Sequence, residues 1–67
     1  MDDLENLRTV RQALVVRRRD LASRAAMSPA DGSRSATQIA VIQAEIEGID
    51  HAIADEVAAK VRAVTPA

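Results

Sequence analysis

Apolar positions in the second half of the chain repeat every three or four residues. The repeat is carried by five isoleucines: Ile39, Ile42, Ile46, Ile49 and Ile53. Alternating steps of three and four residues place side chains along one narrow seam of an α-helix, as in coiled coils. The pattern therefore predicts a helix over residues 35–62 that packs against a second helix.

The first half of the chain carries a weaker seam with a seven-residue spacing: Leu7, Leu14 and Leu21. It predicts a helix over residues 3–27. Asp2 with Glu5 resembles a capping box, and both acids favour the positive end of a helix. Pro29 should end this helix, because proline cannot continue the backbone hydrogen bonds.

The connector over residues 28–34 joins the two predicted helices. Ser28 followed by Pro29 predicts one short helical turn, and Gly32 predicts a break after it. Ser35 with Gln38 then resembles a second capping box, which would start the next helix. The predicted fold is all-α: one antiparallel, coiled-coil-like helical hairpin that comprises residues 1–67.

A short connector makes the helices antiparallel, so that facing positions have residue numbers that sum to about 61 or 62. In this register the leucine seam faces the isoleucine seam. The register also places Arg11 opposite Asp50, and it places Arg18 opposite Gln43. We expect these arginines to cover the seam with their aliphatic stems and to pair across the helices.

Small residues occupy the back of the second predicted helix. Gly48 within a helix costs about 1 kcal/mol relative to alanine, which suggests that a further helix approaches closely there. An alternative is that alanine simply fills a solvent-exposed helix face. The candidate oligomer face comprises Val41, Ala44, Gly48 and Ala52. We expect a homodimer that forms a four-helix bundle, because a 67-residue chain buries little surface alone.

Composition restricts the chemistry that the chain can perform. Hydrophobic residues make up 48% of the chain, but it contains no cysteine, no aromatic residue and one histidine, His51. Disulfides and thiolate metal sites are excluded, and we expect no metal or cofactor site. The sequence has no nucleophile motif and no paired carboxylates on an apolar face, so we expect no enzymatic activity.

Charge and hydropathy favour a cytoplasmic protein. The net charge is −1, and no apolar run approaches the roughly 18 residues of a membrane span. The N-terminus is acidic, where a signal peptide would be basic. Arginine far outnumbers lysine and alanine is abundant, a composition typical of GC-rich bacterial or phage genomes.

Arginines are concentrated in the first predicted helix. They are candidates for binding an anion or a partner: Arg8, Arg11, Arg17, Arg18, Arg19 and Arg24. Binding of single-stranded nucleic acid normally adds aromatic stacking, which this chain lacks. A solvated face with ion pairs to the acidic second helix is the favoured interpretation.

Two resemblances accompany these patterns. Leu7-Arg8-x-x-Arg11 with Leu14 is similar to the first helix of helical chorismate mutases, but the second helix lacks that family's lysine and polar ligands. The hairpin form resembles the Rop-type RNA-binding dimers in architecture, not in residues. We expect a non-enzymatic oligomerisation or protein-interaction module, such as an assembly or adaptor subunit of a bacterial or phage complex. The alternative is a Rop-like dimer that binds nucleic acid through its arginine-rich helix.

Overall fold

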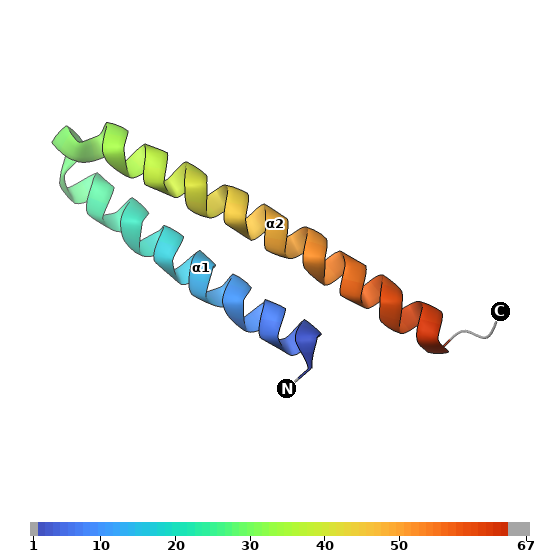
Figure 1. The fold of residues 1–67 in the computed structure, drawn as a ribbon. Helices are drawn as coiled ribbons and strands as arrows, with labels where there is room; N and C mark the ends of the chain where they lie inside the picture. The colour runs from blue at the N-terminus through green and yellow to red at the C-terminus, as the bar shows by residue number, and fades with distance from the viewer. Residues whose placement is uncertain (1, 65–67) are drawn as a thin grey trace.

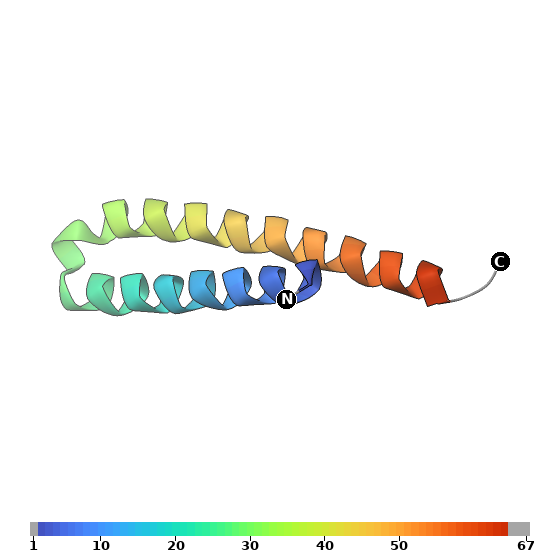
Figure 2. The ribbon, with the colours of Figure 1, turned by 60° about the horizontal axis from the view of Figure 1, so that its bottom comes forward.

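The computed structural model describes residues 2–64 and consists of two long helices joined by one tight turn (Figure 1). Helix α1 spans Asp3–Met27, a 3-10 turn η1 spans Pro29–Asp31, and helix α2 spans Gly32–Val64. The helices lie side by side and antiparallel in both ribbon views (Figures 1 and 2). The predicted all-α hairpin is confirmed at this level.

Helix α1 begins and ends at the residues that the sequence predicts. The side chain of Asp2 accepts a hydrogen bond of 2.8 Å from the backbone N–H of Glu5, which caps the first turn. At the other end, the backbone N–H of Ser28 donates to the carbonyls of Arg24 and Ala25. Proline then follows at the start of η1, where its missing N–H is harmless.

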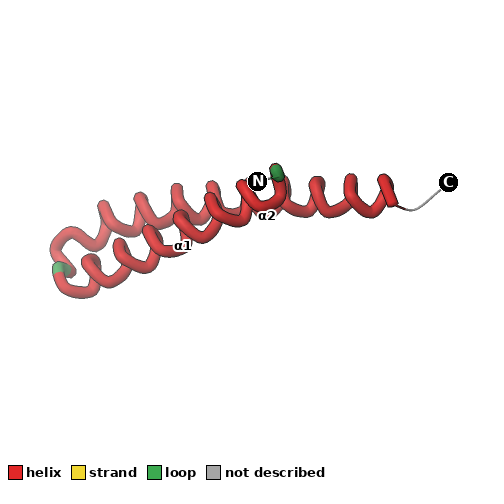
Figure 3. The backbone as a smooth tube through the Cα atoms, turned by 90° about the horizontal axis from the view of Figure 1, so that it is seen from below, coloured by secondary structure: helices red, strands yellow, loops and turns green. Residues whose placement is uncertain are grey.

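The second helix begins at Gly32, three residues earlier than the predicted start at Ser35. Gly32 has right-handed helical angles, φ −55° and ψ −40°, so it does not interrupt the chain. Because η1 leads directly into α2, Ser35 lies inside the helix. Ser28 is the residue between Asp3 and Val64 that lies outside any helix, and Figure 3 shows this short loop segment.

Helix α2 extends past the first residues of α1, as its red end shows in Figures 1 and 2. It has 33 residues against 25 in α1, and it ends at Val64, two residues beyond the predicted end. From the sequence we expect Thr65, Pro66 and Ala67 to be frayed, but these residues lie outside the described part of the chain.

The core is a small cluster between the helices. Among residues 2–64 the buried apolar side chains are Leu4, Val15, Ile42 and Ile46. Val15, Ile42 and Ile46 form one cluster, and the partly buried Leu14 and Leu21 pack against it. The other predicted seam residues, Leu7, Ile39, Ile49 and Ile53, are half-buried. A two-helix layer has no further element to cover them, so part of each side chain stays accessible.

Candidate interaction face

One side of the hairpin carries the cross-helix polar pairs. Nε of Arg11 donates to Oδ1 of Asp50 at 2.5 Å, and Nη1 of Arg18 donates to Oε1 of Gln43 at 2.7 Å. In each pair the residue numbers sum to 61, as the predicted register requires. Steps of seven residues separate the pairs on both helices, so the pairs lie on one side of the hairpin, which we call the paired face.

The open end of the hairpin is closed by a third pair. Nζ of Lys60 donates to Oδ2 of Asp2 at 2.7 Å, and these residue numbers sum to 62. The hydrogen bond from Lys60 and that from the Glu5 backbone N–H lower the pKa of Asp2. The hydrogen bond from Arg11 likewise lowers the pKa of Asp50, and Asp50 raises the pKa of Arg11.

These polar pairs are partly exposed, which limits what they add to stability. The side chains of Arg11 and Asp50 keep 41% and 45% of their surface accessible. Ion pairs of this kind contribute little net free energy, because water competes for both partners. Their main effect is to select one register and one side of the helices, since a shifted pairing would leave each charge without its partner.

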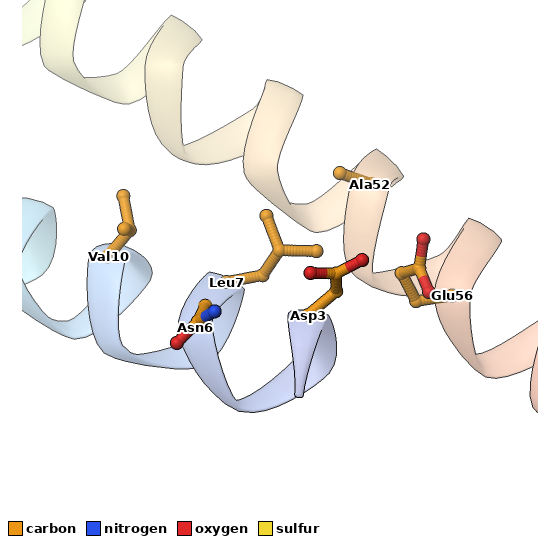
Figure 4. Close-up of a pocket in the computed structure, with 6 residues that line it drawn as sticks. All are labelled: Asp3, Asn6, Leu7, Val10, Ala52 and Glu56. Atoms are coloured by element: carbon orange, nitrogen blue, oxygen red, sulfur yellow. The ribbon is translucent and has the colours of Figure 1, made fainter. Parts of the chain in front are cut away.

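The opposite side of the hairpin has three hollows along its length. The first, of about 360 Å³, is shown in Figure 4 and is lined by Asp3, Asn6, Leu7, Val10, Ala52 and Glu56. The second, of about 190 Å³, is lined by Arg17, Thr37, Gln38, Val41, Ile42 and Glu45. The third, of about 320 Å³, is lined by Leu21, Arg24, Ser28, Asp31, Arg34, Ser35 and Gln38.

The residues that line these hollows repeat every seven positions on each helix. On α1 the series is Asp3, Val10, Arg17 and Arg24, and on α2 it is Gln38, Glu45 and Ala52. A seven-residue step turns a helix by nearly two full turns, so each series lies on one side. Residues two positions apart are about 200° apart, which places Glu45 away from Gln43. We call the side with the hollows the groove face.

Apolar side chains remain accessible on the groove face. Val10 is 47% exposed and Val41 is 57% exposed, and Leu7 and Ala52 are half-buried. In Figure 4, Leu7 points toward α2 and Val10 lies beside it along the same helix. Apart from the Lys60–Asp2 pair, the cross-helix side-chain hydrogen bonds of residues 2–64 lie on the paired face. In the described part of the chain, no side-chain hydrogen bond or ion pair therefore joins the two helices over the hollows.

Gly48 lies between Glu45 and Ala52 in the sequence and is exposed. A Cβ atom added there would meet nothing within 4 Å. The glycine also has no positive φ angle. Packing and backbone geometry within one hairpin therefore give no reason for a glycine at this position. Of the candidate oligomer residues, Val41 and Ala52 line the groove face. Gly48 follows Val41 by seven positions and so lies on the same side of α2, whereas Ala44 lies further outward.

The candidate arginines fall into different environments and do not form one binding site. Arg11 and Arg18 are engaged across the paired face, and Arg24 forms an ion pair of 2.7 Å with Asp20 in its own helix. Arg17 lines the groove face. Helical spacing of about 100° per residue places Arg8 and Arg19 close in angle and roughly opposite Arg17.

Residues 2–64 contain no cluster of three potential metal-ligating side chains. His51 is exposed on α2. No helix within these residues has the length and apolar character needed to cross a bilayer. Comparisons of the chain with known protein families, curated proteins and solved structures found no match.

Proposed function

We propose that this protein is a non-enzymatic self-association module, whose dimer forms a four-helix bundle within a larger protein assembly. The observation that carries the proposal is the surface of the single hairpin. Its accessible surface is 5027 Å². A compact monomer of 7.2 kDa would expose about 4,100 Å².

The excess of roughly 900 Å² matches the area that one partner contributes to a standard protein interface, about 800 Å². The dimensions agree with this comparison. The hairpin measures 57 × 19 × 11 Å, so it is one helix thick. Stable domains usually contain two packed layers, and a second hairpin would supply the missing one.

Sedimentation equilibrium and light scattering test the proposal. We expect a concentration-dependent mass that approaches twice the 7.2 kDa of the monomer. The helical signal in circular dichroism should melt at a higher temperature as the concentration rises, because a dimer gains stability by mass action. A 7.2 kDa species at all concentrations would contradict the proposal.

A nucleic-acid binder is the second candidate. It is favoured by Arg8 and Arg19, which share one side of α1 and form no ion pair within residues 2–64. Two such residues in each hairpin offer few phosphate contacts. A mobility-shift titration of RNA and duplex DNA at 20–50 mM salt, roughly the range where phosphate contacts are strong, tests this second candidate. Binding that Arg8→Ala with Arg19→Ala abolishes would support this function.

A further inference from the structure

We infer that a second copy of the chain packs on the groove face with its turn at the same end. In this arrangement α1 of each hairpin lies against α2 of the other. The inference rests on the proposed self-association and adds the face, the direction and the register of the interface.

The groove face offers a partner apolar side chains that no cross-helix polar pair of residues 2–64 covers. The paired face is occupied by the Arg11–Asp50 and Arg18–Gln43 pairs, whose polar groups already have partners. The groove face instead exposes Val10 and Val41 beside open hollows. Burial of such apolar surface is the main favourable contribution to association.

Symmetry fixes the register of this arrangement. A two-fold axis along the length of the hairpins rotates one copy onto the other without sliding it. Each residue of the second copy therefore stays at its own level along the axis. Residues that face each other between copies then obey the rule that holds within one hairpin, with numbers that sum to 61 or 62.

In this register, side chains of matching chemistry meet between the copies. Val10 of each copy faces Ala52 of the other, which closes the first hollow with an apolar layer. Arg17 of each copy faces Glu45 of the other. Within one hairpin these two residues line the same hollow but form no ion pair. Two copies would create a ring of four alternating charges.

Small residues fall at the level between these two layers. Gly48 faces Ala13 of the other copy in the same register. The space around the Gly48 Cβ position is open in the single hairpin, so it can receive the second copy. Close approach of the helices at this level explains a glycine that the isolated hairpin does not need.

The charges of the whole helices favour the same direction. Helix α1 has six arginines and three acids, a net charge of +3. Helix α2 has five acids and three bases, a net charge of −2. With the turns at one end, every helix is flanked by helices of opposite charge. With the turns at opposite ends, α1 would lie against α1 and α2 against α2, which juxtaposes like charges.

One like-charge cluster remains in the inferred arrangement. It contains Asp3 and Glu56 of both copies at the open end of the bundle. These carboxylates lie at the edge of the hollow, where water and salt screen their repulsion. The central Arg17–Glu45 ring is enclosed between the copies, so its attraction is screened less.

Spin labels measure the direction. The chain has no cysteine, so Ala30→Cys in η1 and His51→Cys near the middle of α2 each give one labelling site. With the turns together, double electron–electron resonance should give a distance of about 15–25 Å between the labels at position 30 of the two copies. With the turns apart, the separation should be about 40 Å or more, the length of α1. The His51 label should give a short distance in either direction and thus reports dimerisation alone.

Charge exchange tests the face and the register. Arg17→Glu and Glu45→Arg should each weaken the dimer by about tenfold, since each converts attraction into repulsion. The double variant should recover most of the affinity. Arg8→Glu with Glu47→Arg, which lie outside the groove face, is the matched control and should leave the affinity unchanged. Circular dichroism of each variant verifies that the helices are intact.

Each outcome bears on a different claim. A long Ala30 distance with a short His51 distance overturns the direction and leaves self-association standing. Short distances for both labels, combined with no recovery of dimer affinity in the Arg17→Glu, Glu45→Arg double variant, would show that the groove face is not the interface. Monomeric mass and no dipolar coupling at either site overturn the proposed function itself.

Discussion

Arg11 and Asp50 are joined across the two helices by hydrogen bonds from Nε to Oδ1 at 2.5 Å and from Nη2 to Oδ2 at 3.4 Å. The guanidinium thus donates to both carboxylate oxygens. This geometry constrains the orientation of the two side chains as well as the sign of their charges. Since the two residues are 39 positions apart, this contact fixes the register of the hairpin at its middle.

Acid should destabilise the hairpin through two carboxylates. The pKa values of Asp2 and Asp50 are lowered by Lys60 and Arg11, respectively. In the unfolded chain an aspartate has a pKa of about 3.9. The stabilisation is therefore present above that pH and is lost as the pH falls through the lower folded values. Acid titration followed by circular dichroism should show helicity decreasing below about pH 4.

Asp50→Asn should remove part of this acid dependence, because the amide cannot ionise. Asp55→Asn is the matched control, since Asp55 forms no ion pair within residues 2–64. An Asp50→Asn variant with the same acid-unfolding profile as the wild type would contradict the role of the Arg11–Asp50 pair.

Val15 and Val16 form a matched test of the core. Val15 is 6% exposed and packs with Ile42 and Ile46, whereas its neighbour Val16 is 54% exposed. Val15→Ala should lower the free energy of unfolding by about 2 kcal/mol through lost burial and a small cavity. Val16→Ala should change it by less than about 0.5 kcal/mol. Urea unfolding at one protein concentration measures both variants, and equal effects would contradict the described core.

Gly48→Ala and Gly48→Leu separate the stability of the hairpin from the stability of the dimer. Alanine removes the conformational penalty of an exposed helical glycine, so we expect about 1 kcal/mol of added stability for the hairpin. Leucine adds a bulky side chain where the second copy should approach, and it should dissociate the dimer. Thermal melting and light scattering separate these effects. An unchanged dimer mass for Gly48→Leu would show that the interface does not include this position.

Asp2 should have two separable roles at the open end. Its Oδ1 accepts from the Glu5 backbone N–H, while its Oδ2 accepts from Lys60. Asp2→Asn retains a capping oxygen but loses the charge, whereas Asp2→Ala loses both interactions. Hydrogen exchange of the Glu5 amide should accelerate in Asp2→Ala and change little in Asp2→Asn. Equal acceleration in both variants would mean that the charge, rather than the cap, protects this amide.

The sequence predicts the pairing of the helices well, because a heptad seam and a short turn leave few registers. The Arg18–Gln43 contact follows from that register alone. Val15 is different, because it lies outside the leucine seam even though the register places Ile46 opposite it. It is buried because the arc of α1 that faces α2 is wider than the leucine seam. Leucines at seven-residue steps define the centre of a contact, not its width.

The start of α2 illustrates a competition that local patterns do not resolve. Gly32 predicts a break because glycine has a low helix propensity, a penalty of about 1 kcal/mol. The helical turn of η1 has already met the cost of nucleation, so continuing the helix through Gly32 is favourable.

The groove face also had a sequence signal, the series Asp3, Val10, Arg17 and Arg24. The series marks an open face only because the polar pairs lie on the other side of the hairpin. That side can be assigned only from the three-dimensional positions of the side chains.

The connection between the helices contains no loop residue besides Ser28. Because a single residue separates α1 from η1 and α2 follows η1 directly, neither helix can slide by a turn unless part of a helix unwinds. Lengthening the chain here would rotate every later residue by about 100° per inserted position if the helix simply continued. The length of the turn thus determines which residues face each other along the whole hairpin, as far as the Lys60–Asp2 pair at the opposite end.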